Sequence, residues 1–246
     1  MSLSVVSLAE RPDLTPAMWS MPHSWPRFML QDLVAEVLYR RIADDFPAHQ
    51  LVALDGDGEP VGRVNTVPFA WTGEDDDLPD LGWDGVLQRA FRDLERGVRP
   101  TAVSLLEARV VPDRQGRGLS TALLAAARDA VRGLGHTDLF GPVRPTEKHR
   151  EPHTPMREYV ARTRDDGLPA DPWLRVHVRL GARVVRVCPV SMTIPGTLAE
   201  WRAWTGLPLA ESGPVEVPGA LVPVHVSVEQ DAVVYVEPNV WVHHRL

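Results

Sequence analysis

The most informative stretch of the 246-residue chain reads VVPDRQGRGLS, from Val110 to Ser120. It continues the apolar run Val103–Val111 and leads into Thr121–Arg132, which has high helix propensity, so it predicts a strand, a loop and a helix. Gly116 and Gly118 carry no side chain, and a ligand can therefore approach the loop backbone closely. The free N–H groups and the positive dipole end of the following helix favour an anion. The stretch therefore predicts a pyrophosphate-binding loop.

The loop resembles the coenzyme A loop of the GCN5-related N-acetyltransferase superfamily. That family's pattern is Gln or Arg, two residues, Gly, one residue, then Gly or Ala. Gln115 and Gly118 match it, and Ser120 replaces the last small residue. The dinucleotide-binding pattern fails because Thr121 stands where its third glycine is required, and the Walker pattern fails for lack of a Gly-Lys-Ser/Thr ending.

The resemblance implies an α/β fold with a mixed, mostly antiparallel central sheet flanked by helices. It implies that acetyl-coenzyme A or another acyl-coenzyme A is the co-substrate and that the acyl group passes directly to an amine of a small molecule or peptide. Two alternatives stay open: a non-catalytic, regulatory acyl-coenzyme A-binding module of the same fold, and transfer to oxygen or sulfur. The Val110 N–H would polarise the thioester carbonyl. The residues expected to hold coenzyme A are Val110, Arg114, Gln115, Gly116, Arg117, Gly118, Leu119, Ser120 and Thr121.

Two residues are candidates for moving protons. Family members often place a tyrosine four residues before the Gly of a Leu-Gly-Phe segment, and His177 holds that place before Gly181. A histidine can donate a proton to the leaving sulfur, and the alternative is a hydrogen-bonded helix histidine without a catalytic role. Glu107, three residues before Val110, is the candidate general base. An ion pair with Arg109, or a water relay in place of Glu107, is the alternative.

The rest of the chain predicts an alternation of helices and strands in one domain. We expect that domain to span residues 1–246, with an insertion at about 71–100 and an extra segment at about 195–230. Residues 144–172 predict a long loop with at most one or two helical turns. The expected elements are a helix over Phe28–Ala43, a hairpin of Leu51–Leu54 and Val61–Phe69, a strand over Asp138–Val143, a helix over Trp173–Leu180, a strand over Arg183–Val190, and two closing strands, Ala232–Val236 and Val240–His243.

Two groups of residues are candidates for the acceptor site, because the family often builds its acceptor groove from the early helices and the final strand. For the aromatic side chains, a place in the core is the alternative to recognition. The early group is Trp19, His23, Trp25 and Phe28; the late group is Tyr235, Glu237, Asn239 and Trp241.

Composition excludes several classes of protein. A formal net charge of −7 argues against a nucleic-acid binder and mildly favours a cationic acceptor. Glu10 and Arg11 come too early for a signal peptide, no apolar run is long enough to cross a membrane, and the single cysteine, Cys188, suits a reducing cytoplasm. His149 and His153 lack further ligands, so no metal site is expected. Whether the chain forms a homodimer is left open.

Overall fold

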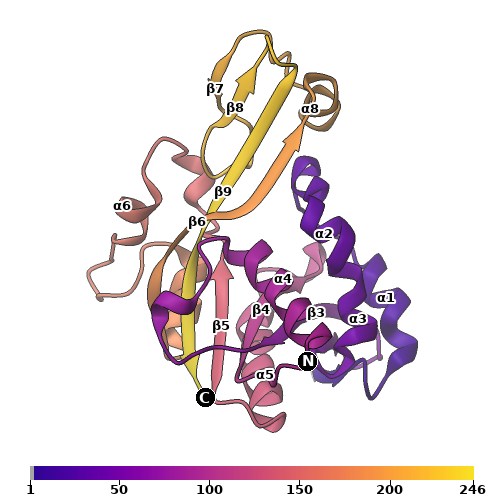
Figure 1. The fold of residues 1–246 in the computed structure, drawn as a ribbon. Helices are drawn as coiled ribbons and strands as arrows, with labels where there is room; N and C mark the ends of the chain where they lie inside the picture. The colour runs from indigo at the N-terminus through magenta and orange to yellow at the C-terminus, as the bar shows by residue number, and fades with distance from the viewer. Residues whose placement is uncertain (1–2) are drawn as a thin grey trace.

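A mixed sheet runs through the computed structural model, which describes residues 3–246 (Figure 1). Its strands follow the order β1-β2-β3-β4-β5-β9-β8-β7, and β6 pairs with the other edge of β9. Only the β4–β5 pair is parallel. The strands are β1 (Ser4–Ser7), β2 (Gln50–Leu54), β3 (Pro60–Phe69), β4 (Ala102–Val110), β5 (Asp138–Val143), β6 (Ala182–Gly196), β7 (Gly213–Val215), β8 (Val224–Ser227) and β9 (Ala232–Arg245). The predicted mixed, mostly antiparallel α/β fold is confirmed.

Helices cover both faces of this sheet. On one face, α5 buries apolar side chains against β3 and β4, and α7 packs against β6. On the other face, α4 packs against β3, β6 and β9 and also contacts α2. The helices are α1 (Thr15–Ser20), α2 (Leu33–Leu38), α3 (Ile42–Asp45), α4 (Gly82–Glu95), α5 (Leu119–Gly133), α6 (Met156–Val160), α7 (Pro172–Arg179) and α8 (Leu198–Thr205).

The helix predicted over Phe28–Ala43 is wrong as one continuous element. A short 3-10 helix over Arg27–Gln31 ends at Asp32, whose backbone is extended with ψ 125°. The Asp32 carboxylate then accepts the Ala35 N–H at 2.8 Å and caps the start of α2. Aspartate favours such N-caps, so the residue that looked like one more polar helix position begins a new helix.

The two predicted closing strands form one strand, β9. Pro238 suggested a break, because proline cannot donate to a sheet ladder. In the structure it lies opposite a bulge of β6, where the register shifts between Cys188 and Met192. On its other side, β9 pairs with β8 only up to Val234 and with β5 only from Val240. Pro238 therefore falls where neither neighbouring strand requires its N–H.

The two segments expected to be additions to a smaller fold extend it in different ways. Residues 71–100 contain α4 (Gly82–Glu95), which packs on the sheet face. Residues 195–230 form α8, β7 and β8, which lie at the top of Figure 1 with the first half of β9. Their own apolar cluster includes Trp201 and joins Phe28 of the early helical region.

Two features are absent from the described residues, a membrane-spanning helix and a cluster of metal ligands. Between residues 3 and 246, no helix is both long enough and apolar enough to cross a membrane. Over the same range, no three side chains of His, Cys, Asp or Glu are grouped as metal ligands would be.

Candidate active site

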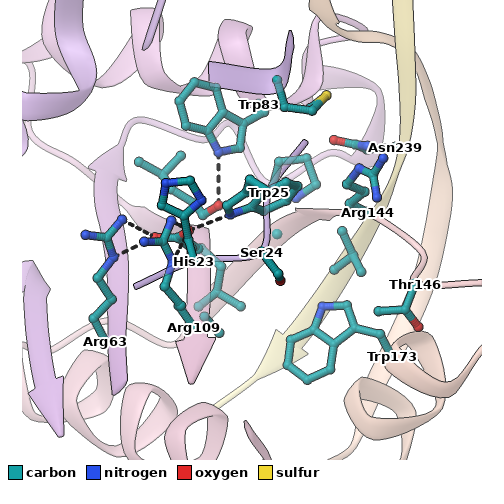
Figure 2. Close-up of a pocket in the computed structure, with 18 of the residues that line it drawn as sticks. His23, Ser24, Trp25, Arg63, Trp83, Arg109, Arg144, Thr146, Trp173 and Asn239 are labelled. Atoms are coloured by element: carbon teal, nitrogen blue, oxygen red, sulfur yellow. Dashed lines mark hydrogen bonds and ion pairs between the residues drawn. The ribbon is translucent and has the colours of Figure 1, made fainter. Parts of the chain in front are cut away.

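A cavity of about 900 Å³ opens where β4 and β5 separate (Figure 2). The two strands pair only through Val103 with Leu139 and Ser104 with Phe140, and then diverge. One end of the cavity reaches the loop before α5 and the helix α7, and the other reaches the early helices and α4. The cavity therefore connects the glycine loop with the early helices along the gap between β4 and β5.

The strand β4 exposes main-chain groups to the cavity along the gap. The Val111 N–H donates to the Val61 carbonyl on β3 at 3.1 Å. Successive N–H groups of a strand point to opposite edges, so the Val110 N–H faces the gap. Leu106 forms a bulge relative to β3, and its carbonyl accepts the Trp83 indole N–H at 3.0 Å.

The loop predicted to hold pyrophosphate has the required backbone. Gly116 and Gly118 adopt φ values of 75° and 78°, in the left-handed region that favours glycine. No other part of the protein lies within 4 Å of where a Cβ of either residue would stand, so the space before the loop is open. Gly118 precedes α5, and no side chain caps that helix end. The first N–H groups of a 15-residue helix are thereby presented to a ligand.

Some side chains of the loop hold it in place, and others face solvent or the cavity. The Gln115 amide donates to the Val110 carbonyl at 3.2 Å, which ties the loop to the end of β4. The guanidinium of Arg114 lies 3.6 Å from Asp55. Arg117 and Thr121 are exposed, and Leu119 and Ser120 line the cavity.

Glu107 lies in the cavity floor, and two arginines flank it. Its Oε2 is 2.6 Å from Arg63 Nη2, and its Oε1 is 2.6 Å from Arg109 Nη2. The Trp25 indole donates to Oε1 at 3.0 Å, and the Tyr39 hydroxyl lies 3.1 Å from Oε2. Burial raises the pKa of the Glu107 carboxyl, but the two guanidiniums outweigh it and hold that pKa below its ordinary value. A carboxylate this stabilised is a weak base, and the predicted base role stays a prediction.

His177 lies on α7 at the other side of the cavity and is 1% exposed. Its Nδ1 is 2.9 Å from Nε2 of His244, and its own Nε2 has no hydrogen-bond partner among the described residues. Burial, together with the neighbouring imidazole, holds the pKa of His177 well below its ordinary value. The ring is therefore neutral at physiological pH, and its role as proton donor stays a prediction.

Several residues that line the cavity were not predicted from the sequence, and others were predicted only as members of a candidate acceptor group. Arg63, Tyr39 and Trp83 gave no signal, because their place depends on how distant segments pack. Of the early aromatic group, Trp19, His23 and Trp25 line the cavity, whereas Phe28 is buried against Trp201. Of the late group, Glu237 and Asn239 line the cavity, whereas Tyr235 and Trp241 are buried in the core.

A second ion pair lies where the chain leaves β5. Arg144 donates through Nε to Glu237 at 2.9 Å and through Nη2 to the Gly219 carbonyl at 2.5 Å. Its guanidinium lies 5.5 Å from the Trp25 ring centre. Figure 2 shows Arg144 and Asn239 on the side of the cavity opposite Arg63.

Comparison with known proteins places this site in context. The chain is 33% identical to the arginine N-acetyltransferase avaD of Aspergillus versicolor, over 98% of this chain and 93% of that protein. Its fold is similar to the loading GNATL domain of CurA from Lyngbya majuscula, with a TM-score of 0.62 and 18% identity over 100% of this chain and 98% of that one. It is also similar to the GphF GNAT-like decarboxylase in complex with isobutyryl-CoA, with a TM-score of 0.55 and 17% identity over 100% and 99% of the two chains. No protein-family model matches the chain.

Proposed function

The chain belongs to the GCN5-related N-acetyltransferase superfamily and is an acyl-coenzyme A-dependent N-acyltransferase, and we propose that arginine or a closely related basic amine is its acceptor. The observation that carries the acceptor is the identity of 33% with an arginine N-acetyltransferase over nearly the whole of both chains. The cavity supports it, because its volume of about 900 Å³ extends from the glycine loop to the early helices and has room for a thioester arm and an acceptor.

The coenzyme A end of the site is the loop before α5. The backbone of Gly116 and Gly118 and the first N–H groups of α5 would bind the pyrophosphate, with Arg114 and Arg117 near it. Gln115 would hold the loop against β4. The pantetheine arm would lie in the gap between β4 and β5 as an added strand, and the Val110 N–H would bind the thioester oxygen.

The acceptor end is the part of the cavity beside the early helices and α4. Indole rings line it, and aromatic faces attract cations such as an ammonium or guanidinium group. Trp19, Trp25 and Trp83 supply these rings, but Arg63 already lies 5.1 Å from the Trp19 ring centre and Arg144 lies 5.5 Å from that of Trp25. Glu36 adds a carboxylate at the exposed rim. This end suits a small, partly apolar molecule whose cationic group lies toward Glu36.

Transfer would be direct, without a covalent enzyme intermediate. The neutral amine nitrogen forms a bond to the thioester carbon, and the carbon–sulfur bond breaks. The departing thiolate takes a proton from water, the neutral His177 N–H would donate a hydrogen bond to the sulfur, and the acceptor nitrogen loses its proton to solvent. Cys188 is not a nucleophile for this reaction, because it is buried and its pKa is raised to about 12 by that burial.

The test is thiol release from acetyl-coenzyme A in the presence of arginine. We expect arginine to accelerate release at least tenfold over acetyl-coenzyme A alone, about the effect of 1.4 kcal/mol. Mass spectrometry of the product would show which nitrogen carries the acyl group. If arginine does not change thiol release but another class of amine accelerates it, the proposed acceptor is wrong and the N-acyltransferase reaction stands. Release unchanged by a broad panel of amines would favour a binding module.

A further inference from the structure

The floor of the cavity carries more positive than negative charge. Arg63 on β3 and Arg109 on β4 share one carboxylate, that of Glu107. The three side chains are 3%, 12% and 9% exposed, so they are largely removed from water. A buried guanidinium without an anion of its own is costly, because water no longer solvates its charge.

Among residues 3–246, no other side chain that contacts this cluster supplies a second negative charge. Tyr39 contacts Glu107, but burial raises the pKa of the phenol and keeps it neutral. Trp25 donates a hydrogen bond and brings no charge. The carbonyls of Met18 and Met21, at the end of α1, accept from the two guanidiniums at 2.6 and 3.3 Å. Those carbonyls offset part of a unit charge but not all of it.

Glu107 has no capacity left for a further cation. Its two oxygens accept from both guanidiniums and from Trp25, and Tyr39 lies within hydrogen-bond distance. A cationic group of the substrate would therefore meet a filled carboxylate and two positive charges. This part of the cavity favours the opposite sign.

Arg109 is the most exposed member of the cluster, at 12% against 3% for Arg63 and 9% for Glu107. It lies on β4 immediately before Val110, where the strand borders the gap, and it lines the cavity. Its Nε and Nη2 bind Glu107, whereas Nη1 has only the 3.3 Å bond to the Met21 carbonyl. Figure 2 shows Arg109 among the residues that line the cavity, with Arg63 to its left.

We propose that Arg109, backed by Arg63, binds a carboxylate of a substrate next to the site of acyl transfer. The inference rests on the proposed function in one respect, that the transferred acyl group and the amine meet in this cavity. The carboxylate has two sources: the α-carboxylate of an amino-acid acceptor, or the distal carboxylate of an acyl group such as malonyl or succinyl. In the first case the two arginines also favour the neutral form of the neighbouring α-amine, which is the nucleophilic form.

The acceptor source is tested with arginine and argininamide, which differ in the carboxylate. Calorimetry on the protein saturated with coenzyme A gives both dissociation constants without requiring turnover. If the acceptor supplies the carboxylate, arginine binds about 10- to 100-fold more tightly than argininamide, the range for hydrogen bonds to a charged group. Arg109→Gln removes this difference by weakening arginine and leaving argininamide within about threefold.

The donor source is tested by comparing acetyl-coenzyme A with malonyl- and succinyl-coenzyme A on the same protein. If the acyl group supplies the carboxylate, the wild type binds the acidic donors about 10- to 100-fold more tightly than acetyl-coenzyme A, and Arg109→Gln abolishes the preference. A wild type that distinguishes neither pair of ligands by more than about twofold overturns the proposal.

Controls separate recognition from structure and from the proposed function. Arg109→Lys keeps the charge but loses the planar fork, so it should retain an intermediate preference. Arg92→Gln, an exposed arginine on α4 outside the cavity, loses the same charge and should change neither preference. If both Arg109 variants bind all the ligands more weakly by the same factor and have a lowered Tm, Arg109 has a structural role and the proposal is rejected. Failure of the proposed function is distinguishable, because the thiol-release assay would then detect no acylation of any amine, whatever dissociation constants calorimetry gives.

Discussion

His177 and His244 form a pair of buried imidazoles, and their hydrogen bond defines what His177 can do. If His244 donates through Nε2 to His177 Nδ1, the hydrogen of His177 lies on Nε2, the atom without a partner. Because burial lowers the pKa of both rings, His244 to about 4, neither is an imidazolium at neutral pH. His177 would then assist the departing thiolate through a neutral N–H rather than as a charged acid.

His177→Phe tests this role at the level of one residue. We expect kcat to fall by about 10- to 1000-fold, near the range of a single acid–base group, while the dissociation constant of acetyl-coenzyme A changes little. Since the pKa of His177 lies well below 6.5, its ionisation should leave no inflection in the wild-type rate above about pH 6. An unchanged kcat in a folded variant would return His177 to a packing role, and a loss of coenzyme A affinity alone would make it a pantetheine contact.

Glu107 shows where sequence reasoning about a site stops. Its place on an apolar strand predicted that the carboxylate had a purpose, and Arg109, two residues away, was a recognisable partner. Arg63, Trp25 and Tyr39 come from β3 and the early helices, so their contacts with Glu107 depend on strand register and helix packing. Those long-range contacts decide whether the carboxylate is a base or an ion-pair partner.

At the scale of elements, two buried carboxyls join α2 to α4. Asp32 Oδ1 caps α2, and Asp84 Oδ2 accepts the Thr193 N–H of β6 at 3.2 Å. The remaining oxygens, Asp32 Oδ2 and Asp84 Oδ1, have no hydrogen-bond partner among the described residues, and the two carboxyls influence each other's pKa. Burial, reinforced by the neighbouring Asp32, raises the pKa of Asp84 to about 8, so the pair holds a proton at neutral pH.

This pair makes the stability of the protein depend on pH. The unfolded chain releases the Asp84 proton near 3.8, whereas the folded protein keeps it up to about 8. Between these values the folded state binds more protons, so this carboxyl makes the free energy of unfolding fall as pH rises. Above about pH 8 the proton is lost from both states, and the repulsion between two buried carboxylates remains.

Asp84→Asn keeps a hydrogen-bonding group that cannot ionise. We expect the variant to be more stable than the wild type at pH 8, by about 1 to 3 kcal/mol, with the difference shrinking toward pH 4. Urea unfolding across this range measures it. Asp76→Asn, at an exposed carboxyl of the loop before α4, is the matched control and should leave the pH dependence unchanged. Parallel curves for wild type and Asp84→Asn would contradict the assignment.

Local signals determined which elements were predicted correctly. The hairpin of β2 and β3, the strand β5 and the helix α5 each have a clear apolar pattern bounded by glycine or proline, and all three were found. The break at Asp32 was missed because a capping aspartate and an exposed helix aspartate look alike in a sequence. The continuity of β9 through Pro238 was missed because it depends on the bulge of a partner strand.

At the scale of the whole molecule, the separation of β4 and β5 organises the site. The glycine loop, which the sequence predicts to bind pyrophosphate, follows β4 and lines the cavity. The cluster around Glu107, which only the assembled sheet brings together, lines the same cavity. The strand β9 closes the arrangement by pairing with both β5 and β6 and by bringing Glu237 and Asn239 to the cavity. Acyl-coenzyme A would therefore enter the cavity from the glycine loop.

Binding of acetyl-coenzyme A at the loop is tested by calorimetry on the wild type, Gly118→Asp and Gly135→Asp. The two glycines stand at opposite ends of α5, with φ values of 78° and 88° and no neighbouring atoms to clash, so the backbone strain of substitution is matched. We expect the wild type to bind acetyl-coenzyme A. In Gly118→Asp the affinity should fall on the order of 100-fold or more, because the new carboxylate meets the phosphates. In Gly135→Asp the affinity should change by less than about threefold. No binding by the wild type at millimolar concentration, or equal losses in the two variants, would contradict binding at the loop.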